Sequence, residues 1–346
     1  MEKGHYTLTE IGRQHEAFAI TRNQFPAFAQ IIEEVKKEGF TKILFMGCGT
    51  SYFLAGAASA YFARFNDITC DYLASFEFYK NTECYVKPND KVLLVPFTRV
   101  ASSTETMIAV KKGVEMPNVK SLQITCDDFS KTYSTWSLFI PDMHENSIVM
   151  TSSFSTMLYT AMFFAAQMAG NEKVLAELQK LPEDTATHMA AYNDQMKELA
   201  QKFTDMKVFI GLGSGAHYGL AGEASIKVKE MTLTPSECYY SLEYRHGPIS
   251  IADKRTVVAY FVSKNTCVED EKLISELKAL GSCVIALGCI TEGIEKLADV
   301  SYKTDICECA NLPELIIPLQ YFGCHLAVAK GYDPDAPQNL SKAIIL

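Results

Sequence analysis

The chain has 346 residues, of which 48% are hydrophobic and 21% are charged, and its formal net charge is −9 at pH 7. These values are typical of a folded globular protein of about two domains, and they exclude a disordered or fibrous chain. The negative charge argues against a nucleic-acid-binding protein, whose surface would carry basic stripes. Because no run of about 18 apolar residues occurs, we expect no membrane span. The first residues contain no apolar segment of the kind found in secretion signals, so we expect a cytoplasmic protein.

Eleven cysteines are present, but their spacing gives neither a metal-binding nor a disulfide framework. There is no C-x-x-C pair, and the closest pair, Cys307 and Cys309, has no histidine near it in the sequence. Structural zinc sites need four ligands at recognisable intervals. We therefore predict no bound metal, and we interpret the cysteines as reduced thiols that serve as small hydrophobic side chains.

The predicted elements begin with helices and continue as alternating strands and helices. We predict an N-terminal helical segment over residues 1–38, a first domain over 39–170, a helical linker over 171–206 and a second domain over 207–346. The linker is expected to be interrupted at Leu181-Pro182. Continuous apolar strands that alternate with helices indicate parallel sheets covered by helices on both faces. The expected fold class is therefore α/β, with two tandem flavodoxin-like or Rossmann-like domains.

The second half of the chain repeats the first. The predicted strands begin at Lys42, Val92, Ser121 and Ser137 in the first half, and at Lys207, Val257, Cys283 and Val300 in the second. Each strand has its counterpart about 165 residues later, and Leu54-Ala-Gly recurs at the same spacing as Leu220-Ala-Gly. Chance similarity between apolar strands does not give several matches in order at one spacing. We therefore infer a tandem duplication.

Glycine and hydroxyl residues follow the first predicted strand of each half. The two loops are Gly47-Cys48-Gly49-Thr50-Ser51 and Gly211-Leu212-Gly213-Ser214-Gly215. Glycines let the backbone approach a ligand, hydroxyls donate hydrogen bonds, and the N-terminus of the following helix attracts an anion. In open α/β sheets such loops line the ligand crevice. We expect them to bind a phosphorylated sugar.

Two other interpretations of the first loop stay open. A dinucleotide-binding fingerprint would need a third glycine where Tyr52 stands, although Asp71 lies about where a ribose-binding acid would be. Alternatively, Thr50 and Ser51 only cap the next helix, a geometry that is also compatible with phosphate binding.

The loop after the second strand of the first half is again rich in hydroxyl groups. It reads Thr98-Arg-Val-Ala-Ser-Ser-Thr-Glu105 and leads into a predicted helix. Arg99 is well placed to meet a phosphate. Ser103 and Thr104 are as suited to capping the helix as to binding a ligand.

The helix predicted after the second glycine loop carries candidate catalytic side chains. Glu223, Lys227 and Glu230 are spaced i, i+4 and i+7, so they share one helix face. Taken alone, this spacing favours a solvated stripe of ion pairs. His246 follows in Glu243-Tyr-Arg-His-Gly-Pro. A histidine before Gly-Pro is expected in an exposed loop, where it is available for proton transfer.

These motifs resemble those of the SIS (sugar isomerase) family in its double-domain form. That form includes the isomerase half of glucosamine-6-phosphate synthase and stand-alone amino-sugar-6-phosphate deaminase/isomerase enzymes. The resemblance covers the chain from about Thr9 to Leu346. It rests on Gly47-Cys-Gly-Thr-Ser, Glu145 through Thr151-Ser-Ser-Phe, Glu223 through Lys227 to Glu230, Glu243-Tyr-Arg-His-Gly-Pro and Asn339-Leu-Ser-Lys342. The family's second-strand loop usually reads Ser-x-Ser-Gly, whereas this chain has Thr98-Arg-Val100-Ala101.

The resemblance implies a role for each matching residue. Glu230 would be the base that moves a proton between C1 and C2 of the sugar. His246, supplied by the neighbouring subunit of a dimer, would open the sugar ring. Lys227 and Lys342 would lie near the reacting centre, with Lys342 on a C-terminal tail that closes over it. The candidate substrate-binding residues are Cys48, Gly49, Thr50, Ser51, Thr98, Arg99, Ser102 and Ser103.

We therefore expect a sugar-phosphate isomerase-type enzyme that needs neither a metal nor a cofactor. Its expected reaction converts glucosamine or galactosamine 6-phosphate to a ketohexose 6-phosphate and ammonia through an enediol-type intermediate. Two alternatives stay open: a deglycase acting on phosphorylated fructosamine adducts such as fructoselysine 6-phosphate, and a non-catalytic sugar-phosphate-binding protein. The expected partners are a small sugar phosphate and a second copy of the chain, in a homodimer with a shared active site. No nucleic acid or membrane is expected.

Overall fold

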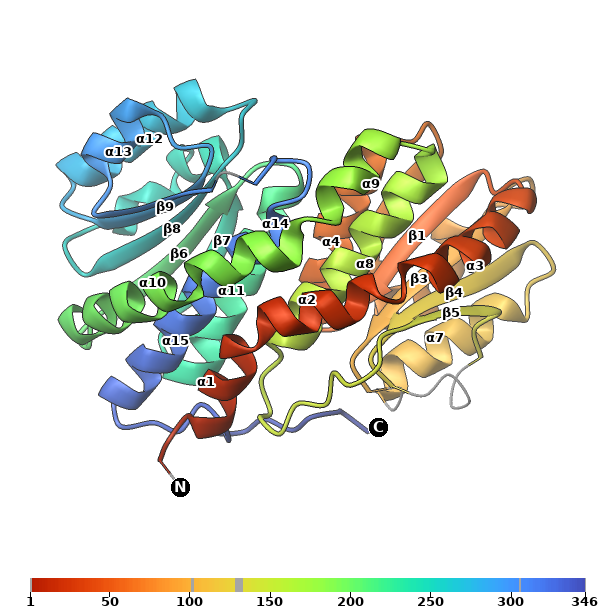
Figure 1. The fold of residues 1–346 in the computed structure, drawn as a ribbon, viewed down its shortest axis with the longest axis horizontal. Helices are drawn as coiled ribbons and strands as arrows, with labels where there is room; N and C mark the ends of the chain where they lie inside the picture. Colours follow the sequence, from red (N-terminus) through yellow and green to blue (C-terminus); the bar gives the residue numbers. More distant parts are fainter. Residues whose placement is uncertain (1, 101–102, 128–132, 305, 346) are drawn as a thin grey trace. The chain divides into compact units, whose positions relative to one another are not determined.

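The computed structural model describes residues 2–100, 103–127, 133–304 and 306–345. The chain divides into two compact units, each built around one parallel sheet (Figure 1). The first-sheet unit comprises Arg13–Glu145, Met150–Pro182 and Ser341–Leu346. The second-sheet unit comprises Met1–Gly12, Asn146–Val149 and Glu183–Leu340.

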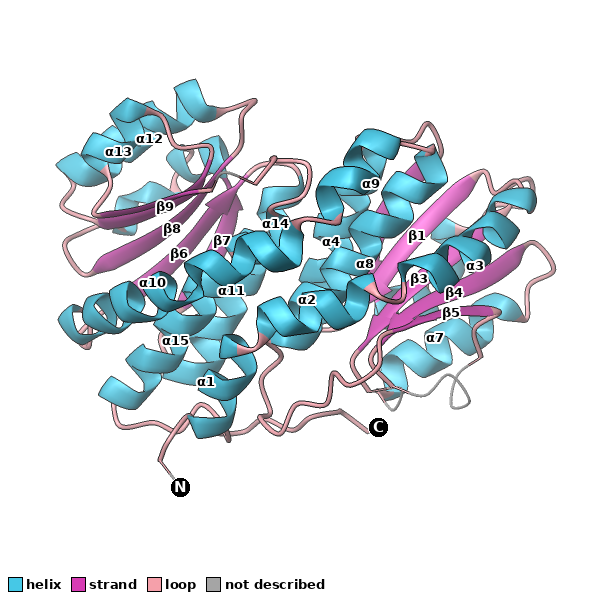
Figure 2. Cartoon of the chain, viewed as in Figure 1, coloured by secondary structure: helices cyan, strands magenta, loops and turns pink. Residues whose placement is uncertain are grey.

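The first-sheet unit has five parallel strands in the order β2-β1-β3-β4-β5, with helices on both faces (Figure 2). The strands are β1 (Lys42–Gly47), β2 (Thr69–Ala74), β3 (Val92–Thr98), β4 (Val119–Thr125) and β5 (Trp136–Phe139). The helices are α2 (Gln14–Arg22), α3 (Phe25–Lys37), α4 (Thr50–Ala63), α5 (Ser75–Lys80), α6 (Thr82–Tyr85), α7 (Thr104–Val114), α8 (Ser152–Ala169) and α9 (Glu172–Leu178).

Side chains that alternate along β1 fill the two cores of this unit. Leu44 and Met46 point to one face of the sheet and belong to a cluster with Phe78 of α5 and Ala109 of α7. Phe45 points to the other face, where it packs 5.8 Å from the ring of Phe62 on α4. Because both faces are covered by helices, the strand is apolar along its length, as parallel strands are.

The second-sheet unit has the strand order β10-β9-β8-β6-β7, again all parallel. The strands are β6 (Val208–Gly213), β7 (Ser236–Tyr240), β8 (Thr256–Val262), β9 (Cys283–Gly288) and β10 (Val300–Lys303). The helices are α1 (His5–Gly12), α10 (Leu181–Lys202, which begins in the first-sheet unit), α11 (Ala216–Thr232), α12 (Cys267–Ala279), α13 (Glu292–Leu297), α14 (Leu312–Leu315) and α15 (Ile317–Ala329), with short 3₁₀ helices η2 (Ser241–Arg245) and η3 (Pro248–Ile251).

The two sheets have the same topology, which confirms the predicted α/β fold with tandem parallel-sheet domains. Gly47 of β1 pairs with Ala74 of β2, and Gly213 of β6 pairs with Tyr240 of β7. These pairs are equivalent positions of the two copies. The sequence prediction placed the end of the second-half strand at Ile210, but β6 continues to Gly213, so its glycine loop begins later than expected.

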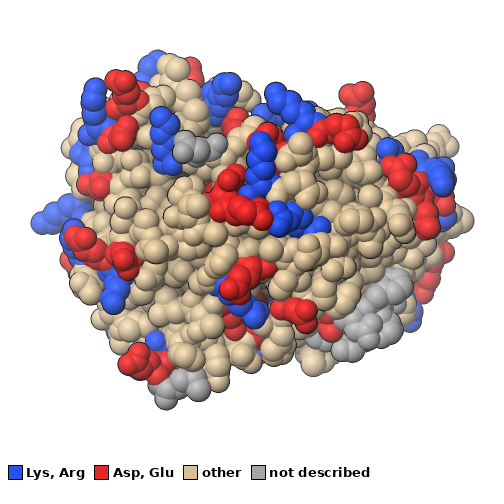
Figure 3. All heavy atoms as spheres, in the orientation of Figure 1, with Lys and Arg blue, Asp and Glu red and all other residues tan. Residues whose placement is uncertain are grey.

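One helical stretch, Leu312–Ala329, is long and apolar enough to span a membrane, with a mean hydropathy of 1.2. It consists of α14 and α15, and 83% of it is buried inside the protein. A core helix has the same composition, so its burial identifies it as part of the second-sheet core. On the face drawn in Figure 3, acidic and basic side chains of the described residues are interspersed rather than gathered by sign.

Candidate active-site residues

The first glycine loop lies at the carboxyl end of β1, where it turns the chain into α4. Gly49 occupies the N-cap position with φ 55° and ψ −124°, in the region that favours glycine. Thr50 and Ser51 are the first two residues of α4, and both are buried. No side chain caps this helix, so the interpretation of Thr50 and Ser51 as simple caps is wrong. The backbone N–H groups of Ser51 and Tyr52 donate hydrogen bonds of 3.0 Å to the carbonyl oxygens of Cys48 and Gly49.

The same turn is built in the second copy. Gly215 is the N-cap of α11, with φ 59° and ψ −131°. A Cβ atom added to Gly47 would lie 2.4 Å from the backbone of Ser51, and one added to Gly213 would lie 2.4 Å from the backbone of His217. The loop equivalent to Gly47–Ser51 is therefore Gly213–His217, and a histidine stands where the first copy has Ser51.

Cys48 joins a chain of polar groups in the first-sheet unit. Its Sγ atom lies 3.6 Å from Oγ1 of Thr106, which in turn lies 3.1 Å from Oγ of Ser75. Cys48 and Gly49 also line an open cavity of about 550 Å³. The loop residues with a predicted ligand role thus border a space in which a small molecule fits.

In the second-strand loop, the hydroxyl groups of Thr98 and Ser103 differ in their hydrogen bonding. Thr98 ends β3, and its Oγ1 donates a hydrogen bond of 2.7 Å to the carbonyl oxygen of Val100. Ser103 is the N-cap of α7, but its side chain makes no capping hydrogen bond. Ser102, a predicted substrate-binding residue, lies outside the described residues, as does Ala101.

Arg99, expected to meet a phosphate, forms a buried ion pair. Its Nη1 atom lies 3.1 Å from Oε2 of Glu145, and the two side chains are 8% and 0% exposed. Nη2 donates to the carbonyl oxygen of Lys342 at 3.4 Å, and Nζ of Lys342 donates to the carbonyl oxygen of Glu145 at 2.5 Å. The structure therefore joins Arg99 and Lys342 through Glu145. This places the C-terminal tail of the chain against the second-strand loop.

Glu145 also fixes the start of α8. Its carboxylate accepts hydrogen bonds from the backbone N–H and hydroxyl groups of Thr151 and Ser153, at 2.6 to 3.1 Å, and from the hydroxyl of Ser152 at 3.2 Å. Burial alone would raise the pKa of this carboxyl. The charge of Arg99 and the hydrogen bonds of Ser153 and Thr151 outweigh burial and lower the pKa below its ordinary value.

The charged face of α11 is buried rather than solvated. The side chains of Glu223 and Lys227 are 0% and 1% exposed, and that of Glu230 is 20% exposed. Nζ of Lys227 contacts Oε2 of Glu230 and lies 3.9 Å from Oε1 of Glu223. The expectation of a solvated stripe, drawn from the spacing alone, is wrong. A buried ammonium is instead held between two carboxylates, one of which is partly accessible.

His246 is exposed, as its position before Gly-Pro predicts. It follows η2 directly, and its backbone N–H donates to the carbonyl oxygen of Glu243 at 3.0 Å. The backbone of this short turn therefore holds the histidine at the surface of the second-sheet unit.

The predicted residues thus form separate groups. Arg99 and Lys342 share one network, and Cys48 and Gly49 share one cavity, all in the first-sheet unit. Lys227 and Glu230 form an ion pair in the second-sheet unit, which also contains His246.

Two polar residues of these networks were not assigned a role from the sequence. Glu145 was recognised only as part of a motif, and Thr106 was not singled out. A lone acidic residue six positions before a Thr-Ser-Ser sequence is the signal that could have indicated the helix cap.

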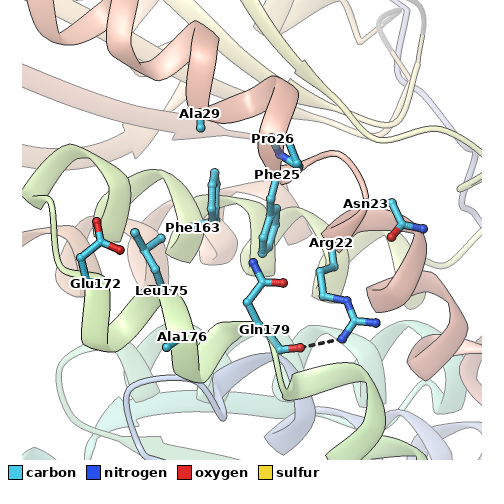
Figure 4. Close-up of a pocket in the computed structure, with 10 residues that line it drawn as sticks. All are labelled: Arg22, Asn23, Phe25, Pro26, Ala29, Phe163, Glu172, Leu175, Ala176 and Gln179. Atoms are coloured by element: carbon cyan, nitrogen blue, oxygen red, sulfur yellow. Dashed lines mark hydrogen bonds between the residues drawn. The ribbon is translucent and has the colours of Figure 1, made fainter.

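A further cavity of the first-sheet unit contains none of the predicted residues. It measures about 630 Å³ and lies among α2, α3, α8 and α9 (Figure 4). The ring of Phe25 stacks on that of Phe163 at 3.9 Å, and Nη1 of Arg22 donates to the carbonyl oxygen of Gln179 at 2.6 Å.

Comparison with known proteins identifies a SIS domain in the first half of the chain. It matches residues 38–168. The chain is 25% identical over 99% of its length to glutamine–fructose-6-phosphate aminotransferase (isomerizing) of Methanothermobacter thermautotrophicus, of which it covers 58%. It is 28% identical over 86% of its length to the enzyme of the same name from Vibrio cholerae, of which it covers 51%. The SIS-domain chain thus spans about half the length of these relatives.

Solved structures share the whole double-sheet architecture. Glucosamine-6-phosphate deaminase from Thermotoga maritima is 28% identical, with a TM-score of 0.78 over 99% of this chain and 100% of that one. Tagatose-6-phosphate ketose/aldose isomerase from Escherichia coli has a TM-score of 0.85 over 99% of this chain and 96% of that one. At 22% identity, the second likeness shows the fold alone.

Proposed function

We propose that this SIS-domain protein is a sugar-phosphate isomerase-type enzyme that deaminates a 2-amino-2-deoxyhexose 6-phosphate. The products are a ketohexose 6-phosphate and ammonia. The observation that carries this proposal is the pair formed by Lys227 and Glu230, in which a buried ammonium contacts a partly exposed carboxylate. The likeness to a glucosamine-6-phosphate deaminase along the full chain supports the same reaction.

The buried charges of α11 are costly, and this cost favours a functional role for them. Taking an ammonium and a carboxylate out of water costs several kcal/mol per ion, and a well-packed apolar pair is often no less stable. Glu223 and Lys227 nevertheless stand where apolar side chains would pack. In an isomerase, Lys227 would stabilise negative charge that develops on the sugar, and Glu230 would carry the proton.

The reaction follows from one proton transfer. With the sugar ring opened by proton transfer through His246, Glu230 removes the proton at C2 of the aldose. When O1 takes up a proton, this gives an enolamine with a C1–C2 double bond. Return of the proton to C1, with loss of a proton from the nitrogen, gives a 2-imino sugar. Water then adds to the imine carbon, ammonia leaves, and the ketose phosphate remains. We assign binding of the phosphate to the glycine loop and the second-strand loop. Thr50 and Ser51 are buried at the N-terminus of α4, and Thr98 is buried at the end of β3.

A deglycase is the second candidate, and the cavity beside Cys48 favours it. A fructosamine 6-phosphate carries its amine on C1, so the same base would take a proton from C1 and return it to C2. Water would then release an aldose 6-phosphate and the free amine. Such a substrate needs room for the amine substituent, and Cys48 and Gly49 border a cavity of about 550 Å³.

The remaining features of the proposal follow the resemblance to the family. We propose a cytoplasmic homodimer in which His246 acts in the site of the neighbouring subunit. The chemistry requires only a carboxylate base, a second acid/base and cations, so we propose that it proceeds without metal or cofactor.

Three substrates distinguish the candidate functions. The protein is incubated separately with glucosamine 6-phosphate, galactosamine 6-phosphate and fructoselysine 6-phosphate, while ammonia and free lysine are measured. Ammonia from one of the two amino sugars supports the deaminase. If neither amino sugar releases ammonia, the deaminase is refuted, and release of lysine establishes the deglycase. Binding of all three without any product would identify a non-catalytic sugar-phosphate-binding protein.

A further inference from the structure

Aromatic rings form much of the wall of the cavity beside the first glycine loop. Its lining includes Cys48 and Gly49 of the loop and the aromatic residues Tyr52, Phe53, Tyr72, Phe76 and Tyr85. Its volume of about 550 Å³ lies within the range of pockets that bind small ligands. Since the loop is the proposed phosphosugar-binding element, a group that enters this cavity could belong to the same substrate.

The second copy of the fold shows why the cavity is open. Ala74 pairs with Gly47 in the first sheet, and Tyr240 pairs with the equivalent Gly213 in the second. The ring of Tyr240 stacks on that of Tyr218 at 4.1 Å between centroids and an angle of 13°. Tyr52 is the third residue of α4, as Tyr218 is of α11, and it lies 5.3 Å from the ring of Tyr72 at an angle of 46° between the planes. Alanine at position 74 leaves Tyr52 without the parallel stacked ring that Tyr240 gives to Tyr218.

The backbone at the two positions is the same, so the difference is one of side chain. Ala74 has φ −67° and ψ 140°, and Tyr240 has φ −60° and ψ 137°. A tyrosine would thus fit the backbone at position 74. The second copy has a tyrosine, Tyr240, at this position, whereas the first copy has an alanine, Ala74.

The charged side chains that line the cavity are both acidic. Glu77 of α5 and Glu105 of α7 line it, and its described lining contains no lysine or arginine. Oε1 of Glu77 accepts hydrogen bonds from Nδ2 of Asn81 at 2.9 Å and from the hydroxyl of Tyr85 at 3.0 Å. Lys80, whose ammonium lies 5.3 Å from the centroid of Phe76, is outside the lining. Aromatic faces combined with carboxylates are the surroundings that bind an organic ammonium group.

We propose that this cavity binds a positively charged alkylamine substituent carried on the nitrogen of the phosphosugar substrate. The inference rests on the deglycase, the second candidate of the proposed function, because a fructosamine adduct carries a substituent on its nitrogen. The phosphosugar itself would be bound by the adjoining glycine loop. The inference identifies the substrate class as N-substituted amino-sugar phosphates whose substituent ends in an ammonium group. Ala74 and Glu77 would then determine specificity without taking part in the proton transfer.

Two matched adducts test this inference. One is the fructosamine 6-phosphate made from 1,5-diaminopentane, which ends in an ammonium group, and the other is made from n-hexylamine, a neutral chain of the same length. Dissociation constants are measured by titration calorimetry, which does not depend on turnover, and glucosamine 6-phosphate serves as the unsubstituted reference. We expect the cationic adduct to bind about tenfold more tightly than the neutral one.

Three variants locate the effect. Ala74→Tyr fills the cavity as Tyr240 does in the second copy, and Glu77→Gln removes one charge while keeping the size of the side chain. Both are expected to abolish most of the preference for the cationic adduct and to leave binding of glucosamine 6-phosphate unchanged. Glu83→Gln removes an exposed charge of α6 outside the cavity lining, and it should keep the preference.

The outcomes separate this inference from the proposed function. Equal binding of the two adducts, or a preference that survives in Ala74→Tyr and Glu77→Gln, overturns the inference even if glucosamine 6-phosphate is deaminated. A cationic preference that these variants remove supports the inference even if no ammonia or amine is released. Failure of all three phosphosugars to bind overturns both.

Discussion

Lys227 and Glu230, three residues apart on α11, form an ion pair. The side chain of Lys227 is 1% exposed and that of Glu230 is 20% exposed. The ammonium is also 3.9 Å from the fully buried carboxylate of Glu223. The arrangement forms a buried charged cluster on α11 inside the second-sheet unit. Its partly exposed member, the carboxylate of Glu230, is accessible to a ligand.

Replacing Lys227 with methionine is expected to destabilise the fold. The substitution leaves the carboxylate of Glu223 buried without its ammonium, and loss of one partner of a buried pair costs about 3–5 kcal/mol. The free energy of unfolding is measured by urea titration. Lys229→Met, on the exposed side of the same helix, is the control and should change stability by less than about 0.5 kcal/mol. Similar small losses in both variants would show that Glu223 does not depend on Lys227.

The buried carboxylate of Glu145 should make stability depend on acid pH. Its pKa is lowered in the folded state, so its contribution is present above the ordinary carboxyl value of 4.5 and is lost as the pH falls through the folded-state pKa. Glu145→Gln is therefore expected to be less stable than the unchanged protein at pH 7, with the difference shrinking below about pH 4.5. Urea titrations at several pH values measure this, with exposed Glu115→Gln as the control. A difference that is constant with pH would contradict the assigned charge state.

Lys342 is expected to affect turnover more than folding. Its side chain belongs to an exposed residue of the C-terminal tail, although Nζ bonds the carbonyl oxygen of Glu145. Lys342→Met should lower kcat for the preferred phosphosugar by at least about tenfold, because a cation near the developing charge is lost. The free energy of unfolding should change by less than about 1 kcal/mol. Unchanged kcat would remove Lys342 from the proposed catalytic residues, and Ser341→Ala provides the neighbouring control.

A shared active site predicts complementation between two inactive variants. Glu230→Gln and His246→Ala are each expected to be inactive as homodimers. In a mixed dimer, one site would combine the two intact residues, so random mixing should restore about a quarter of the original activity. The variants are unfolded, mixed and refolded together, and activity is compared with that of each variant treated alone. No recovery, with folded dimers formed, would show that both residues serve the same subunit's site or that the assigned roles are wrong.

The sequence predicts the fold well because its main signals are local. Apolar strands that alternate with helices, and their recurrence at one spacing, are sufficient to indicate two parallel sheets. The exact end of β6 at Gly213 was missed, since glycines are usually found in loops. There the glycine is required because a Cβ atom would clash with the backbone of His217.

The surroundings of the candidate residues depend on contacts between distant parts of the chain. Arg99 and Glu145 are 46 residues apart, and nothing in either local sequence indicates that they pair. The burial of Glu223 and Lys227 could not be read from their spacing, because a solvated and a buried charged face have the same periodicity. The cavity at Ala74 could not be predicted from the sequence, because the equivalence of Ala74 and Tyr240 depends on how their strands pair in the two sheets.

The role of Glu230 as the base is tested most directly by turnover of glucosamine 6-phosphate in deuterium oxide. Ammonia and deuterium at C1 of the ketose product are followed by NMR, for the unchanged protein and for Glu230→Gln. We expect the unchanged protein to release ammonia and to place solvent deuterium at C1. The variant should bind the substrate but release ammonia at least about 100-fold more slowly. Equal rates of ammonia release and deuterium incorporation in the two proteins would contradict the assignment of Glu230 as the proton-transferring base.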